Sequence, residues 1–99
     1  MRSFVQISLA LLLLPAVSAF AYSGEKLASQ AKLTMADAQT IALKARPGKI
    51  TDRELEREKG GSGLRYSFDI KSQGLTYEVG VDAADGKVLE NAKEGSHPD

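Results

Sequence analysis

The stretch "LRYSFDIKSQGLTYEVGVD", residues 64–82, decides the fold of this 99-residue chain. Apolar and polar side chains alternate on both sides of Gln73 and Gly74, which predicts two strands that each have one apolar face. Two residues are enough for a hairpin loop when a glycine supplies the positive φ. The resulting pairing brings apolar residues opposite one another: Ile70 with Tyr77, Phe68 with Val79, and Tyr66 with Val81.

The segment "ITDRELEREK", residues 50–59, precedes this hairpin and joins it through the glycine-rich residues 60–63. Pairing Lys59 with Leu64 would place Leu55 opposite Phe68 and Glu58 opposite Arg65, a core pair and a charge pair together. A glycine-rich loop that binds phosphate opens a helix and is followed by Lys and Ser or Thr. This loop lies between two strands, so we expect a plain connection.

The segment "DAADGKVLE", residues 82–90, raises the alternative of a calcium loop. With Gly86 at the sixth position of an EF-hand loop, only Asp85 of the tested ligand positions is acidic. We therefore expect a hairpin loop of three or four residues, with Gly86 in the left-handed conformation and a fourth strand after it. The two loop lengths differ by one residue, which leaves open whether Val88 or Leu89 points inward. Asp82 is expected to face Arg65 as a cross-strand ion pair.

The segment "LTMADAQTIALKARPG", residues 33–48, has the marks of a helix. Thr34 and Asp37 form a capping box, while Pro47 and Gly48 end the pattern. One face carries apolar side chains at helical spacing: Met35, Ala38, Ile41, Ala42 and Ala45. The predicted class is α+β, with one N-terminal helix packed on a three- to four-stranded antiparallel sheet.

Residues 1–21 have the pattern of a cleaved secretory signal: Arg2, the apolar run "LALLLLPAV", and small residues at Ala19 and Ala21. The apolar run is shorter than the roughly 20 residues that a spanning helix needs. We expect cleavage after Ala21, which leaves 99 minus 21, or 78, residues. In that mature chain we expect a polar tether over 22–33, the domain over 34–93, and a disordered tail over 94–99.

Composition excludes several functions. Removing Arg2 leaves 12 basic and 13 acidic residues, a net charge of −1, which gives no basic surface for nucleic acid or anionic lipid. The chain has no cysteine, and its one histidine, His97, lies in the expected tail. Disulfides, an ordinary structural zinc site and a cysteine nucleophile are therefore not expected. We predict that the protein is not an enzyme and needs no cofactor.

Three segments together resemble the PepSY domain family: "LTMADAQTIALKARPGKI", "LEREKGGSGLRYSFDI" and "YEVGVDAADGKVLE", within residues 33–92. The closing "YEV.VDA.DGKVL" pattern is the most specific. The resemblance implies one helix on an antiparallel sheet and no catalytic motif. It also implies a module that assists the folding of a secreted protease, inhibits it, or accompanies sensor and reductase proteins outside the cytoplasm.

The candidate site consists of charges on the polar face of the predicted sheet. In the pairing above, Glu54, Asp69 and Glu78 lie side by side on three adjacent strands, and like charges in that position cost stability. Such a row suits a basic partner segment or a cation. Arg65 and Lys71 flank Asp69, so the alternative is a solvated surface whose charges offset one another.

We therefore expect an exported binding module that modulates a protease or another envelope protein. The alternative is a periplasmic sensor of a small ligand or metal ion. The two differ in what they need: a sensor requires a concave site with convergent polar groups, whereas a protein binder can use a flat face or a strand edge.

Overall fold

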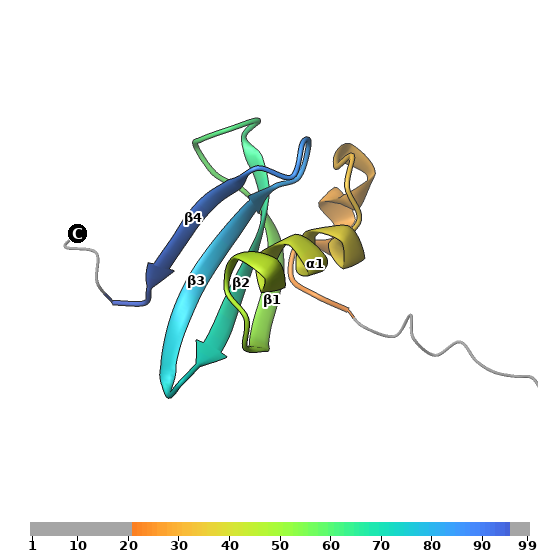
Figure 1. The fold of residues 1–99 in the computed structure, drawn as a ribbon. Coiled ribbons are helices and arrows are strands. Elements are labelled where there is room, and N and C mark those ends of the chain that lie inside the picture. The colour runs from red at the N-terminus through yellow and green to blue at the C-terminus, as the bar shows by residue number, and fades with distance from the viewer. Residues whose placement is uncertain (1–20, 96–99) are drawn as a thin grey trace, which may run out of the picture.

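The computed structural model describes residues 21–95, in which one helix packs on a four-stranded antiparallel sheet. Figure 1 shows helix α1 (Met35–Ala45) lying across one face of this sheet. The strands lie in chain order: β1 (Lys49–Arg57), β2 (Leu64–Ser72), β3 (Leu75–Asp82) and β4 (Val88–Lys93). The predicted α+β class is confirmed, with four strands rather than three.

The expected signal peptide lies outside the described residues except for Ala21. Of the tail expected at 94–99, only Glu94 and Gly95 are described. Within residues 21–95 no helix has the length and apolar character needed to cross a membrane.

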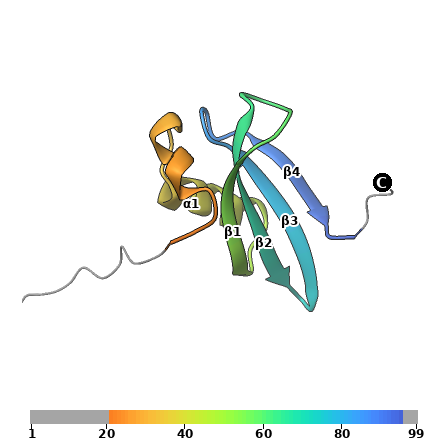
Figure 2. The same ribbon diagram turned by 180° about the vertical axis from the view of Figure 1, so that it is seen from behind.

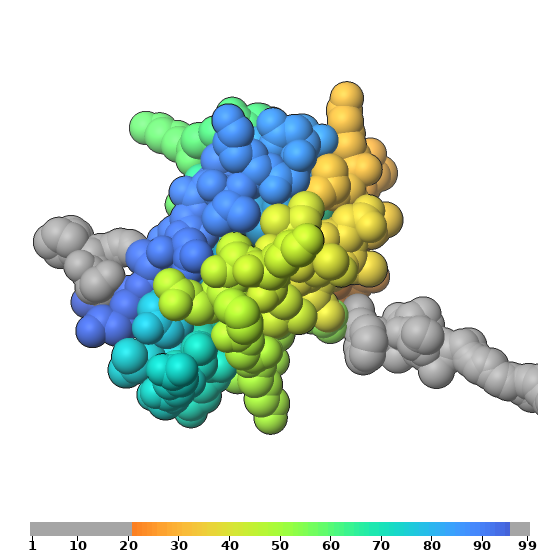
Figure 3. Space-filling view, in the orientation of Figure 1, coloured from red at the N-terminus to blue at the C-terminus, as the bar shows by residue number. Residues whose placement is uncertain are grey.

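The capping box predicted for α1 is present. The Thr34 hydroxyl accepts a hydrogen bond from the Asp37 N–H at 3.1 Å, and the Asp37 carboxylate accepts one from the Thr34 N–H at 3.3 Å. The fully buried residues of the helix are Ala38 and Ala42. Because both side chains are small, they let the helix approach the sheet closely, and Figure 3 shows α1 covering part of this face of the sheet.

The core lies between α1 and the sheet. Its largest fully buried side chains come from all three of the first strands: Leu55, Tyr66, Phe68, Ile70, Val79 and Val81. The Tyr66 hydroxyl, at the end of this layer, donates a hydrogen bond of 2.7 Å to the Leu33 carbonyl. Burial, with smaller contributions from Tyr22 and Asp37, raises the pKa of Tyr66 to about 12. Tyr66 therefore stays a neutral donor at ordinary pH.

The β2–β3 hairpin has the predicted register. Phe68 pairs with Val79, Ile70 with Tyr77, and Gln73 and Gly74 form the loop with positive φ angles.

The β3–β4 connection is a hairpin turn, as predicted. The Asp82 N–H donates to the Lys87 carbonyl at 2.8 Å, which leaves the four residues 83–86 as the loop. Gly86 has φ 81°, and a Cβ there would lie 3.0 Å from the Cδ1 of Ile41 on α1. Only glycine therefore fits both the turn and the packing of the helix against it. Val88 pairs with Val81 on the helix side of the sheet but is 38% exposed, whereas the side chain of Leu89 lies near Gly61.

The predicted register of β1 against β2 is wrong by two residues. Leu55 lies opposite Tyr66 rather than Phe68, and Glu56 rather than Glu58 lies opposite Arg65. The strand β1 ends at Arg57, paired with Leu64, so the connecting loop covers residues 58–63. From Asp52 to Arg57 a shift of two residues keeps each side chain on its predicted face of the sheet. A bulge between Ile50 and Asp52 interrupts this alternation and places Ile50 opposite Ile70 on the helix side.

Residues 22–33, expected as a polar tether, are part of the fold. They include a 3-10 helix, η2 (Glu25–Gln30), and Tyr22, Leu27, Ala31 and Leu33 pack against the core. The Leu55 N–H of β1 donates to the Ser23 carbonyl at 2.8 Å. The backbone of this segment follows an irregular path along the core. The apolar residues that contact the core are therefore not spaced as in a regular helix, which is why the sequence pattern predicted a tether.

Candidate functional site

The face of the sheet opposite α1 carries no helix of residues 21–95, and the 58–63 loop packs over one end of it, at Arg65 and Asp82. Figure 2 shows this face from behind, with α1 on the far side. We call it the open face. The side chains of this face are assigned by alternation from the buried residues of each strand and, on β4, from Asn91, which bonds the Ala45 carbonyl on α1. Its exposed and half-buried acidic side chains are Asp52, Glu54, Glu56, Asp69, Glu78, Glu90 and Glu94, and the buried Asp82 lies on it opposite Arg65. Its basic side chains are Arg65, Lys71 and Lys49, which is paired with Lys71. The open face is therefore strongly acidic, although the whole chain has a formal net charge of zero.

An acidic row crosses this face, but its first member differs from the prediction. Asp69 pairs with Glu78 as expected, while Asp52 takes the place opposite Asp69 that was expected for Glu54. Glu54 lies on the same face, opposite Ser67. The two-residue shift of β1 is the cause. The alternation of Asp52 with Arg53 indicates that Asp52 lies on the open face. Its position opposite Asp69 follows only when the length of the 58–63 loop is known. We call Asp52, Asp69 and Glu78 the acidic row.

The acidic row is electrostatically strained. Burial, followed by the charges of Glu94 and Asp52, raises the pKa of Asp69 above its usual value. Burial, followed by Glu90, Asp69, Glu56 and Glu94, raises the pKa of Glu78. Each neighbouring carboxylate makes ionisation of the next one harder, because directly opposed like charges repel. The folded sheet thus holds negative charges together at some cost in stability.

Arg65 lies at the end of the open face next to the 58–63 loop and is only 7% exposed. Its Nη2 donates to the Lys59 carbonyl at 2.9 Å, and its Nη1 forms an ion pair with Glu90 at 3.5 Å. The guanidinium crosses Gly80, where a Cβ would lie 3.1 Å from Nη1. The glycine therefore gives Arg65 room against the sheet. The Arg65 Nε–H is buried and has no hydrogen-bond partner among the described residues.

Asp82 pairs with Arg65 across the two strands, as the register predicted, but its carboxylate is held by other groups. It accepts hydrogen bonds from the Ser62 hydroxyl at 2.6 Å, the Ser62 N–H at 2.7 Å and the Ala84 N–H at 2.8 Å. Burial alone would raise the pKa of Asp82, but these bonds and the nearby Arg65 outweigh it, so the pKa is lowered. Asp82 therefore joins the 58–63 loop to the β3–β4 turn, a role that the sequence pattern did not reveal.

The acidic residues do not form a metal site in the described part of the chain. Among residues 21–95 no three histidine or acidic side chains are grouped closely enough to hold a metal ion. Asp85, the one acid that matched the calcium pattern, accepts a hydrogen bond from the Lys87 N–H at 2.9 Å within the turn.

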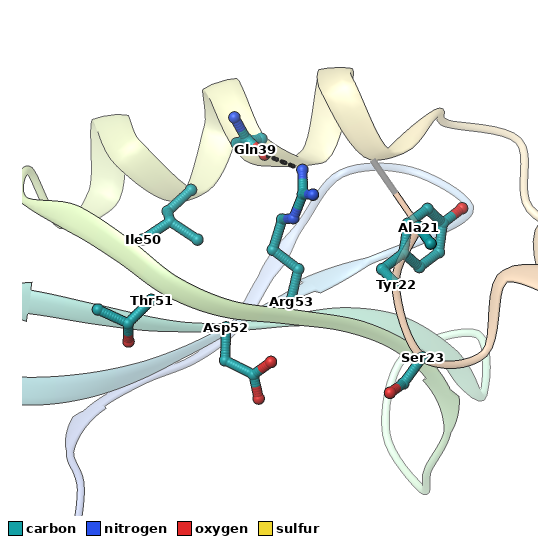
Figure 4. Close-up of a pocket in the computed structure, with 8 residues that line it drawn as sticks. All are labelled: Ala21, Tyr22, Ser23, Gln39, Ile50, Thr51, Asp52 and Arg53. Carbon is teal, nitrogen blue, oxygen red and sulfur yellow. Dashed lines mark hydrogen bonds between the residues drawn. The ribbon is translucent and has the colours of Figure 1, made fainter. Parts of the chain in front are cut away.

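A groove of about 580 Å³ lies beside the edge strand β1, apart from most of the open face. Figure 4 shows Ile50 and Arg53 pointing toward α1, where Arg53 donates a 3.1 Å hydrogen bond to Gln39, whereas Asp52 points away. Residues 21–23 form the opposite wall. The groove was not foreseen, because it depends on the N-terminal segment that was expected to be a tether.

Comparison with known proteins agrees with the fold and the motifs. The model of the peptidase propeptide and YPEB domain family, PepSY, matches residues 32–91. No curated protein and no solved structure matches the chain. Domains of this family are protease propeptide-like modules of the inhibitor type, without a catalytic role of their own, and are generally extracytoplasmic. Since the match covers more than half of the 99 residues, the chain belongs to the PepSY family.

Proposed function

We propose that this PepSY domain is an exported binding module that modulates, by inhibition or by assistance in folding, an extracytoplasmic protease or another envelope protein. The observation that carries the proposal is the open face. A side of the sheet without a helix, covered only at one end by the 58–63 loop among the described residues, holds Glu54, Asp69, Glu78 and Arg65, the residues of the candidate site.

A flat face of this kind suits a protein partner better than a small molecule, which needs a concave site. The arrangement of charges supports the same conclusion. Opposed like charges such as Asp69 and Glu78 reduce stability, and residues that break a local rule of stability are expected at functional positions.

The test begins with capture. The exported protein, immobilised, is used to retain proteins from an envelope extract, and the retained protein is identified and purified. Its proteolytic activity and its refolding yield are then measured with and without added domain. We expect a retained protease or envelope protein whose activity or refolding changes in proportion to complex formation. A retained protein that is unaffected in both assays, or no retained protein, would contradict the proposal.

A second candidate is the small-ligand sensor, and the groove beside β1 favours it. Gln39 and Arg53, joined by a 3.1 Å hydrogen bond, bring polar groups together there, next to the apolar side chain of Ile50. A panel of small polar metabolites, screened by the melting temperature of the exported protein, tests this candidate. Binding at the groove predicts a concentration-dependent rise in melting temperature that Gln39→Ala reduces.

A further inference from the structure

Charge is segregated between the open face and the rest of the described chain. Residues 21–95 contain 12 basic and 12 acidic residues. The open face takes eight of the acids, counting the buried Asp82, and three of the bases, which leaves nine bases and four acids elsewhere. Charges that served only solubility would be interspersed, as both signs are in ordinary surfaces. The negative charge of the open face therefore favours partners that carry positive charge.

The negative charge of the open face excludes two classes of partner. Nucleic acids and anionic lipid surfaces carry dense negative charge and would be repelled by the acidic row. A lone metal ion lacks a grouped set of ligands among the described residues. A polypeptide with lysine or arginine side chains remains, because its cations can pair with separate carboxylates across several strands.

Arg65 supplies a second and independent observation. It is 93% buried on this face, counted as the complement of its 7% exposure, and its Nε–H has no acceptor among residues 21–95. A buried donor without a partner costs stability until an acceptor reaches it. A backbone carbonyl is such an acceptor, so the open face can accept both cations, at its carboxylates, and a carbonyl, at Arg65. An extended polypeptide segment offers the two together.

We propose that the open face binds an extended, lysine- or arginine-bearing segment of the partner protein. Its cationic side chains pair with the acidic row, and one of its carbonyls approaches the Arg65 Nε–H after a small movement of the guanidinium. This inference rests on the proposed function and names the chemistry of the partner. Arg65 lies four residues from Asp69 along β2, about 13 Å at about 3.3 Å per residue, and adjacent strands are about 4.8 Å apart. A segment that reaches both the acidic row and Arg65 therefore runs obliquely over the strands and needs about six residues.

The test uses three synthetic peptides of about eight residues, long enough to cross the sheet with some overhang. Their sequences alternate threonine with lysine, with glutamine or with glutamate, and each carries a fluorescent label. Binding to the exported protein is followed by fluorescence anisotropy at about 50 mM and about 150 mM salt, which changes the screening length. We expect binding of the lysine peptide alone, weaker at the higher salt concentration.

Two variants assign the binding to the row. Asp69→Asn combined with Glu78→Gln should weaken binding of the lysine peptide about tenfold and reduce its salt dependence, since two exposed ion pairs are lost. Glu25→Gln removes the same type of charge from exposed η2, away from the open face, and should leave binding unchanged. Thermal unfolding of the double variant should occur at or above the temperature of the unchanged protein, which shows that folding is intact.

Equal binding of the lysine and glutamine peptides would overturn the inference, and so would a double variant that binds as well as Glu25→Gln. A concentration-dependent dimer that the double variant abolishes would assign the face to a second copy instead. The proposed function is judged separately. If the double variant retains the same envelope protein as well as the unchanged chain does, this inference fails and the proposed function stands. If the lysine peptide binds the row but no envelope protein is retained, the proposed function fails instead.

Discussion

Replacing Asp82 by asparagine should be among the most damaging single changes available at constant side-chain size. The carboxylate is 2% exposed and uses both oxygens to accept three hydrogen bonds, two from Ser62 and one from the Ala84 N–H. An asparagine keeps one oxygen and turns an NH2 group toward a backbone N–H. One charge-assisted hydrogen bond is lost, and the new NH2 group faces a backbone N–H, so that two donors oppose each other. Together these changes should lower the free energy of unfolding by about 2–4 kcal/mol. For a domain of this size that corresponds to a fall in melting temperature of roughly 10–30 °C.

The cost should depend on pH in a definite direction. Because the folded-state pKa of Asp82 is lowered, its contribution to stability is fully present above the unfolded-state value of about 4. It is lost as the pH falls through the lower folded-state value. The difference in unfolding free energy between the unchanged protein and Asp82→Asn is therefore largest near neutrality and shrinks in acid.

Urea unfolding followed by circular dichroism, at neutral pH and below the unfolded-state pKa, measures both effects. Asp85→Asn is the matched control, since Asp85 lies in the same turn but is exposed and accepts one hydrogen bond, from the Lys87 N–H. It should cost less than about 1 kcal/mol. If Asp82→Asn costs no more than this control, or if its cost grows as the pH falls, the role assigned to Asp82 is wrong.

Four further changes or measurements test other parts of the molecule. Phe68→Ala, at a side chain that is 1% exposed, should lower the free energy of unfolding by about 3–5 kcal/mol, and an unchanged circular dichroism melt would show that the core is misassigned. Asp69→Asn should be neutral or slightly stabilising at pH 7. The raised pKa means that ionised Asp69 opposes folding above its unfolded-state pKa, so any gain should disappear toward about pH 4 in a urea titration. Tyr66→Phe leaves the Leu33 carbonyl without its donor and should cost about 1 kcal/mol in the same assay. Mass spectrometry of the exported protein should find a first residue at Tyr22 or within two positions of it, and an intact Met1 would contradict signal cleavage.

The parts of the fold that the sequence predicted well are those fixed by short-range constraints. The β2–β3 pairing followed from a two-residue loop that fixes which residues lie opposite each other, with Phe68 against Val79. The limits of α1 followed from its capping box and from Pro47. In both cases a few neighbouring residues determine the geometry.

The β1–β2 register could not be determined in the same way. In the predicted register Leu55 met an aromatic core residue and Arg65 met a glutamate, but both statements are also true two residues away, where Leu55 meets Tyr66 and Arg65 meets Glu56. The alternation repeats every two residues and does not distinguish the two. The difference lies in the 58–63 loop, whose Ser62 is held by the distant Asp82. That error placed Glu54 instead of Asp52 in the acidic row.

The contact between Ser23 and Leu55 has a consequence for where the domain can be cut. β1 is an outer strand, and a bare outer strand is a template on which another chain can add its own strand. Residues 22–30 cover the second half of that strand, through the Ser23 carbonyl and a hydrogen bond from Arg57 to Gln30. The family match begins only at residue 32, so a chain trimmed to that boundary would keep the buried core residues but lose Tyr22, Leu27 and Ala31, which pack against them, and would expose the strand. Such a fragment should associate edge to edge as its concentration rises, whereas the chain from Tyr22 onward should stay monomeric.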